Sequence, residues 1–291
     1  QNHPGHSSFV TRHSSFVIQE VFMSLVQTNV ITLYYELHGR GSPLVLIPGL
    51  GYDGWMWHKM IPGLAEHFQV ISFDNRGSGQ SNAPPGAYTA QMLAADVVGM
   101  LDAFGLAQAH IMGHSMGGFI AQALAIDYPE RVDRLILSAT NFGGPHHVPI
   151  TPEAMAVLTD LSGDPIERLR RGIGVSCAPG FAEANPEFVD YWVDYRVHHP
   201  INPAGYQSQL AIGLSLLPEA AAFEGRLPAV EAPTLILFGE QDRVVPPDNA
   251  DLLAGVMPHS RIELLPDAGH FFPFETPEAA NASVIRFLTE E

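Results

Sequence analysis

The chain has 291 residues, 46% of them hydrophobic and 15% charged, which suits one large globular domain or one domain with a sizeable insertion. Its 31 acidic residues outnumber 14 Lys and Arg, and the formal charge of -17 gives a surface that repels phosphate backbones and anionic lipid. We therefore expect neither nucleic acid nor a membrane as a partner.

Cysteine content and hydropathy are compatible with a reducing cytoplasm. Cys177 is the single cysteine, so no disulfide can form within the chain, and the cysteine pairs of a structural zinc site are missing. No apolar run reaches the roughly 20 residues that span a bilayer, and the first residues lack the basic and apolar regions of a signal peptide. We expect a soluble cytoplasmic protein with a buried, unreactive Cys177.

The first 22 residues differ in character from the rest. The string HSSFV occurs at His6–Val10 and again at His13–Val17, before a plausible start at Met23. Three histidines in this stretch invite a metal site, but an appended or disordered leader explains them more simply. We assign residues 1–22 as a leader without chemistry.

From residue 23 to 140, and again from 230 to 291, predicted strands alternate with predicted helices. This alternation favours a mostly parallel sheet with helices on both faces. Strand-like runs lie at 30–37, 44–47, 69–73, 109–112, 134–138, 234–238 and 261–265. Helical runs lie at about 55–67, 89–104, 116–127, 249–256 and 277–288.

The alternation stops between residues 141 and 229. Prolines recur there, and the segments around Ala154, Ile166, Phe188 and Tyr206 look helical with no convincing strand between them. We interpret residues 141–229 as a helical cap inserted between two parts of an α/β core, residues 23–140 and 230–291.

The sequence GHSMG at Gly113–Gly117 fits the pattern G-x-S-x-G. A short motif of this kind also arises by chance, so its context matters. It directly follows the predicted strand 109–112 and directly precedes the predicted helix 116–127, where a sharp turn would raise the Ser115 hydroxyl above the sheet. The positive end of that helix faces any charge that forms beside Ser115, which makes the Met116 amide one oxyanion donor.

A second oxyanion donor is expected from the loop after the first core strand. That loop reads Pro48-Gly49-Leu50-Gly51, and its small residues let a backbone N–H turn toward a reacting carbonyl. We choose the Leu50 amide.

A serine hydroxyl needs a base with a pKa near 7, which points to a histidine at the same edge of the sheet. His270 follows the last predicted strand and precedes the last helix, and Asp242 follows the strand 234–238. Ser115, Asp242 and His270 then stand in the order of a nucleophile, an orienting acid and a base. The neighbouring acids are Glu240, Asp248 and Asp267.

Over about residues 26–290 the chain resembles the α/β-hydrolase superfamily, close to its esterase, enol-lactonase and cofactor-free haloperoxidase members. The resemblance implies Ser115 as the nucleophile, Asp242 as the acid and His270 as the base, with the Leu50 and Met116 amides as the oxyanion hole. Residues 74–81 resemble the family's D-x-R-G-x-G-x-S turn, which we take as structural. A serine at the elbow speaks against dehalogenases and epoxide hydrolases, which place aspartate there.

Other polar residues near the motifs are given structural roles. We expect the His114 side chain to point away from Ser115, Arg76 to tie down its own turn, and Asp267 to fix the loop that carries His270. The adjacent histidines 146/147 and 198/199 cannot easily face one metal, so we expect solvated loops, no metal and no cofactor.

Aromatic and apolar residues predict a substrate pocket between cap and core. Trp55 and Met56 follow the oxyanion loop, and the cap offers Trp192. Phe181, Tyr191 and Tyr195 are further cap candidates.

The hypothesis is a serine hydrolase that cleaves a carboxylic ester of a small or medium apolar substrate through an acyl-enzyme. Lactone (enol-lactone), C–C bond, thioester and perhydrolase chemistry on the same triad remain open. A slow-turnover ligand receptor with the same fold is the rival from another class, and a scaffold with relic residues is a third. The expected partner is a small ester or lactone, and the oligomeric state stays open.

Overall fold

The computed structural model describes residues 22–28 and 30–290, which form one eight-stranded sheet in the order β1-β2-β4-β3-β5-β6-β7-β8. β1 and β4 pair antiparallel with β2, and every other neighbouring pair is parallel. The predicted mostly parallel sheet is therefore confirmed. The strands are β1 (Phe22–Gln27), β2 (Thr32–His38), β3 (Ser42–Ile47), β4 (Phe68–Phe73), β5 (Ala109–His114), β6 (Val132–Ser138), β7 (Thr234–Gly239) and β8 (Ser260–Leu265).

The strand β1 is absent from the sequence prediction. It begins at Phe22, the last residue assigned to the leader, and forms the edge of the sheet beside β2. The HSSFV repeats and the leader histidines lie outside the described residues, so the assignment of that segment stays a prediction.

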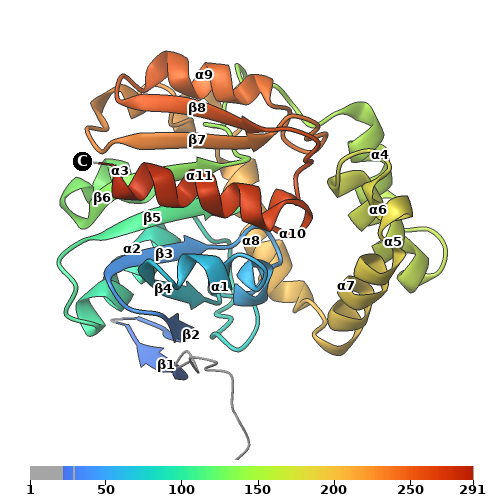
Figure 1. Cartoon of the computed structure of the whole chain (residues 1–291), viewed down its shortest axis with the longest axis horizontal. Coiled ribbons are helices and arrows are strands. Elements are labelled where there is room, and N and C mark those ends of the chain that lie inside the picture. The colour runs from blue at the N-terminus through green and yellow to red at the C-terminus, as the bar shows by residue number, and fades with distance from the viewer. Residues whose placement is uncertain (1–21, 29, 291) are drawn as a thin grey trace, which may run out of the picture.

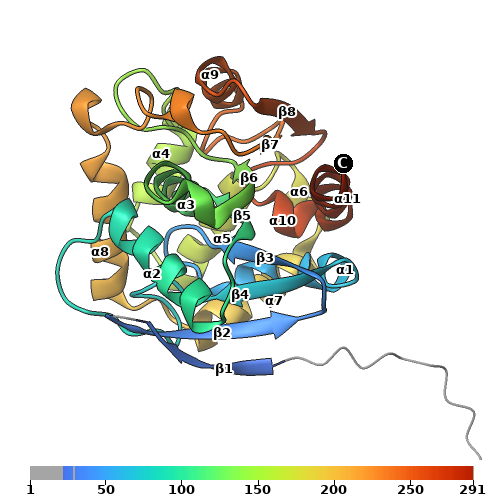
Figure 2. The same ribbon diagram turned by 90° about the vertical axis from the view of Figure 1, so that its left-hand side faces the viewer.

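Helices cover both faces of the sheet, as Figure 2 shows: α2 and α3 lie on one face, and α1 and α11 on the other. The core helices are α1 (Ile61–Leu64), α2 (Ala90–Ala103), α3 (Met116–Asp127), α9 (Asp248–Val256), α10 (Phe272–Glu275) and α11 (Pro277–Thr289). The single helix predicted over 55–67 is wrong, because the chain forms a 3-10 helix η1 (Gly54–Trp57) and the short α1 instead. Pro62 has no N–H to bond the carbonyl of His58, which prevents one continuous helix.

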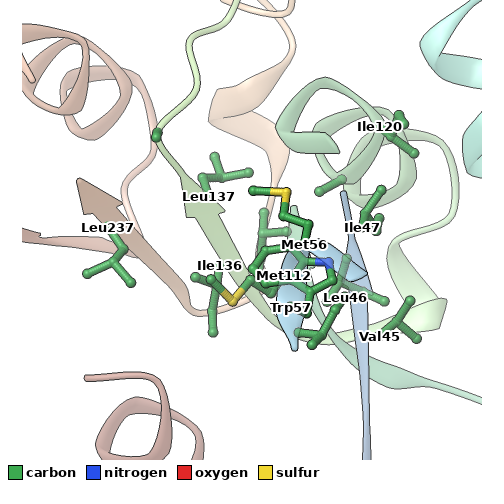
Figure 3. Packing of buried hydrophobic residues seen from close by; sticks show 14 of the residues in the cluster. Val45, Leu46, Ile47, Met56, Trp57, Met112, Ile120, Ile136, Leu137 and Leu237 are labelled. Carbon is green, nitrogen blue, oxygen red and sulfur yellow. The ribbon is translucent and has the colours of Figure 1, made fainter. Parts of the chain in front are cut away.

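The core lies around the central strands β3, β5, β6 and β7. Their side chains are buried on both faces, which explains why each strand reads as a continuous apolar run rather than an alternating one. Met112, Leu137 and Leu237 from three of these strands belong to the same buried cluster as Met56 and Trp57 of η1 (Figure 3). This dense packing gives a rigid base to the loops that leave the carboxyl ends of these strands.

The segment 141–229 contains five α-helices and no strand. In Figure 1, α4 to α7 lie to the right of the sheet, beyond the carboxyl ends of its parallel strands. The cap helices are α4 (Pro152–Thr159), α5 (Pro165–Ser176), α6 (Phe181–Ala184), α7 (Pro186–His198) and α8 (Pro203–Ser215). Thr151, Asp164 and Asn202 cap the N-termini of α4, α5 and α8 by accepting backbone N–H bonds, and each helix has proline in its first turn.

None of the helices in the described ranges is both long enough and apolar enough to cross a membrane.

Candidate active site

Ser115 occupies a strained turn between β5 and α3. Its φ of 55° and ψ of -118° lie in a region that a side chain rarely adopts. A Cβ on Gly113 would lie 2.2 Å from the Gly117 carbonyl oxygen, and one on Gly117 would lie 2.2 Å from the Ile47 carbonyl oxygen. Only glycine at both positions lets the turn close against β3. Strain of this kind costs about 1–3 kcal/mol and is typical of functional positions.

His270 and Asp242 form a buried pair on the loops after β8 and β7. Their side chains are joined by a 2.8 Å hydrogen bond between His270 Nδ1 and Asp242 Oδ2. Asp242 is 3% exposed, and its Oδ1 accepts the N–H groups of Val244 and Val245, both at 2.8 Å. With Nδ1–H donated to the carboxylate, the Nε2 of His270 is left as the basic nitrogen.

Of the acids near His270 in sequence, only Asp242 bonds its side chain among the described residues. Glu240, Asp248 and Asp267 are exposed, whereas Asp242 is buried against the imidazole. Asp267 adopts a positive φ of 54° and accepts a 3.3 Å hydrogen bond from Gln241 Nε2, so it fixes the turn before His270.

Two backbone N–H groups are available as an oxyanion hole. Met116 is the first residue of α3, and Leu50 lies in the loop after β3. Neither N–H has a protein acceptor within the described part of the chain. Leu50 lines the cavity that contains Ser115 and His270. Met116 directly follows Ser115, and Leu50 lines the same cavity as Ser115, so the oxyanion hole stays a prediction that this arrangement permits.

Ser115 and His270 share a cavity of about 480 Å³ between the strand ends and the cap. We call this the catalytic cavity. No hydrogen bond joins the two side chains among the described residues, which is common before substrate binds. Of the predicted pocket residues, Met56 and Trp192 line this cavity.

Trp55 does not line the catalytic cavity. It lies on the wall of a second cavity of about 670 Å³, where its ring stacks on Tyr195 with 3.7 Å between centroids. Asp53 accepts the backbone N–H of Trp55 at the start of η1. Phe181 and Tyr191 line neither cavity.

His114 lies beside the triad in a structural setting. It is 1% exposed, its Nδ1 is 2.8 Å from Ser138 Oγ, and its ring centroid is 4.8 Å from that of His270. Burial and the nearby His270 hold the pKa of His114 well below its usual value. A neutral His114 does not oppose the positive charge that His270 acquires when it takes a proton.

Glu275 and Arg243 bond the cap to the loops that carry His270 and Asp242, and sequence reasoning missed both residues. Glu275 accepts the Gly269 N–H at 3.1 Å and the cap's Ala178 N–H at 2.7 Å. Burial raises the pKa of Glu275 to about 7. Arg243 donates to the carbonyls of Gly174 and Cys177 at 2.9 and 3.0 Å.

Arg196 on α7 also lines the catalytic cavity, and it was missed as well. The signal for it was present, because residues four apart share one face of a helix and Trp192 was already a pocket candidate.

In the described ranges no group of three His, Cys, Asp or Glu side chains could hold a metal ion. His146, His198 and His199 are exposed. Cys177 is fully buried, and burial raises the pKa of its thiol. Arg76 bonds Asp96 of α2 through Nε and Nη2, both at 2.6 Å, so it ties the 74–81 turn to a helix.

The fold and the site together define a hydrolase. Residues 42–277 match the sequence model described as alpha/beta hydrolase fold, so the chain belongs to the α/β-hydrolase family.

Relatives within that family carry several hydrolase names. The putative carbamate hydrolase RutD of Caulobacter sp. (strain K31) is 29% identical over 89% of this chain and 96% of its own length. The 2-hydroxy-6-oxononadienedioate/2-hydroxy-6-oxononatrienedioate hydrolase of Burkholderia vietnamiensis (strain G4) is 31% identical over 89% of this chain and 91% of its own length. The solved enol-lactonase from Burkholderia xenovorans LB400 is 29% identical, with a TM-score of 0.76 over 92% of this chain and all of that one.

Proposed function

We propose that the chain is a serine hydrolase that cleaves carboxylic esters through an acyl-enzyme. The observation that carries this proposal is the buried 2.8 Å Asp242–His270 pair, on the same cavity as a serine held at a positive φ. A serine that only packed or capped a helix would gain nothing from such strain.

In the first step the Ser115 hydroxyl oxygen attacks the ester carbonyl while His270 Nε2 takes the hydroxyl proton. The carbonyl oxygen becomes an oxyanion, which the Leu50 and Met116 N–H groups stabilise, each donor contributing about 2.7–4 kcal/mol in the transition state. His270 then gives its proton to the leaving alcohol, and the acyl group stays on Ser115.

In the second step water replaces the alcohol. His270 Nε2 takes a proton from the water, the resulting hydroxide attacks the acyl carbon, and the bond to Ser115 Oγ breaks as the proton returns to that oxygen. Asp242 keeps the imidazole oriented and stabilises its positive charge throughout.

The test is hydrolysis of short p-nitrophenyl esters together with covalent labelling by a fluorophosphonate. Ser115→Ala should abolish labelling and lower kcat by about 10⁶, the loss typical of removing such a nucleophile. The matched control is Ser176→Ala, since Ser176 lines the same cavity but its hydroxyl donates to the Gly172 carbonyl. Equal turnover by Ser115→Ala and wild type would sink the proposal.

Lactone hydrolysis is the second candidate, and the similarity to a solved enol-lactonase favours it. A lactone is a cyclic ester, so the same residues act in the same steps and the leaving oxygen stays attached to the acyl group. Comparing kcat/KM for lactones and open-chain esters of equal carbon number decides between the two. Slow single turnover on every substrate would instead favour a ligand receptor.

A further inference from the structure

The catalytic cavity carries an unusual balance of charge. Apart from its histidines, its charged lining consists of Asp160, Arg168 and Arg196. Asp160 is paired with Arg171 at 3.2 Å, outside that lining. The charge of Asp160 also interacts with that of Arg168, so Arg196 is the lining cation whose charge no lining carboxylate balances.

Arg196 is the more informative of the two arginines. It is only 7% exposed, and its guanidinium carbon lies 4.8 Å from the centre of the Tyr52 ring and 5.9 Å from that of Trp192. A guanidinium carries five N–H donors, yet in the described ranges Arg196 makes one hydrogen bond, from Nη2 to the Gly51 carbonyl at 3.1 Å.

Carboxylates in the neighbouring second cavity do not supply the missing partner. Arg196 also borders that cavity, which contains Glu36, Asp53 and Asp74, but no ion pair within 4.0 Å joins it to a described acid. Asp74 takes the N–H groups of Gly54 and Gln80, and burial raises its pKa to about 7. Glu36 accepts from two side chains of its own strand, and Asp53 from Tyr195.

A buried charge without a partner is costly, and its aromatic neighbours offset only part of that cost. Holding the Gly51 carbonyl does not require a charge, because a neutral amide could donate the same bond. Guanidinium groups recognise carboxylates through paired, charge-assisted hydrogen bonds.

We propose that Arg196 is the binding residue for a carboxylate group of the substrate, so that this enzyme acts on esters or lactones that carry an anionic group. This rests on the proposed function, and it narrows the apolar substrate expected from the sequence to one with an anionic end. Trp192 and Tyr52 flank the guanidinium and exclude water from the ion pair. The inner wall at Met56 and Leu50 would contact the apolar part of the substrate.

The test compares esters that differ only in charge. One series pairs monoethyl succinate, glutarate and adipate with ethyl butanoate, pentanoate and hexanoate, so that a methyl group replaces each carboxylate on the acyl side. A second series pairs acetate esters of ω-hydroxy acids with the matching alkyl acetates, which places the carboxylate on the alcohol side. Wild type should prefer the anionic member in at least one series by about tenfold or more in kcat/KM.

The variants separate charge from structure. Arg196→Gln can still bond the Gly51 carbonyl but carries no charge, and it should lower the anion preference by about 10- to 100-fold. Arg196→Lys keeps the charge and should retain part of the preference. The control is Arg168→Gln, because Arg168 lines the same cavity but already donates to the Leu161 and Gly163 carbonyls. It should leave the preference within about twofold.

Equal losses on anionic and neutral esters in Arg196→Gln would overturn the proposal, as would the absence of any anion preference in wild type. A binding measurement does not depend on turnover. Calorimetry would compare the affinity for monoethyl glutarate of Ser115→Ala with that of the double variants Ser115→Ala/Arg196→Lys and Ser115→Ala/Arg196→Gln. This measurement tests the carboxylate site even if the protein does not hydrolyse esters. If Arg196→Gln folds poorly, the comparison with Arg196→Lys still tests the site.

Discussion

The floor and the roof of the catalytic cavity are built in different ways. The floor consists of the loops after β3, β5, β7 and β8, which carry Leu50, Ser115, Asp242 and His270. The strands β3, β5 and β7 are almost entirely buried, whereas β8 is partly exposed. An added Cβ on Gly113, Gly117, Gly239 or Gly269 would lie 2.2–2.4 Å from a backbone atom. The roof consists of α4, α5, α7 and α8, and much of its apolar surface is exposed, as at Leu158 and Leu161.

This difference separates chemistry from selection. A rigid floor holds the reacting groups in one geometry, which general acid–base and oxyanion catalysis require. The roof contributes Trp192 and Arg196 to the cavity wall, and under the proposed function their side chains select the substrate. The two parts meet where Glu275 and Arg243 bond the end of α5.

The largest effect is expected when the floor loses its acid. Asp242→Asn keeps the shape but removes the charge that fixes the His270 tautomer, so kcat on p-nitrophenyl esters should fall by about 10⁴. Asp267→Asn is the matched control, because Asp267 is exposed and bonds only Gln241, and it should change kcat less than about twofold. A larger loss in the control would show that the wrong acid has been assigned.

Glycine substitutions should distinguish floor from roof in stability. Gly117→Ala puts a Cβ 2.2 Å from the Ile47 carbonyl oxygen and should lower the free energy of unfolding by about 2–4 kcal/mol. Gly213→Ala in α8 meets its nearest atom, Phe119 Cε2, at 3.9 Å and should raise that free energy by up to about 1 kcal/mol. Both are measured by urea unfolding, and equal effects at the two sites would contradict the comparison.

The floor could be predicted from sequence because its signals are local. Each catalytic loop follows its own apolar strand, and the glycines beside Ser115 mark a close approach that only they allow. The edge strand β1 was missed since its six residues gain their order from pairing with β2, in a stretch next to the unusual leader. The split of the helix at Pro62 was missed because the apolar spacing there continues across it.

The roof could not be predicted to the same degree, because its side chains are placed by contacts that are distant in sequence. Trp55 stacks on Tyr195 of α7, and nothing near Trp55 in the sequence announces that partner. The four-residue spacing from Trp192 puts Arg196 on the same face of α7, but only the fold shows that its guanidinium lies over Tyr52, with no ion pair to an acid among the described residues.

The contact between roof and floor should depend on pH through Glu275. Its pKa rises from about 4.5 in the unfolded chain to about 7 in the fold, so it contributes stability that is present below pH 4.5 and lost as pH rises through 7. Glu275→Gln removes this dependence. The unfolding midpoint of the variant minus that of wild type should therefore increase from pH 5 to pH 8, and a flat difference would show that Glu275 does not titrate in this range.

The smallest effect on stability is expected at the rim of the roof. Leu161 is 78% exposed yet lines the mouth of the catalytic cavity, so Leu161→Ser should change the free energy of unfolding by less than about 0.5 kcal/mol. Leu137→Ala in the floor is the contrasting variant; that side chain is fully buried, and its loss should cost about 2–5 kcal/mol.

The same variant, Leu161→Ser, tests whether long acyl chains leave the cavity past Leu161. Its kcat/KM on ethyl hexanoate should fall by about two- to fivefold while that on ethyl acetate is unchanged, since only the longer chain loses buried apolar area. If Leu161→Ser changes kcat/KM equally for the two esters, the acyl chain takes another route out of the cavity, and Leu161 has no part in substrate selection.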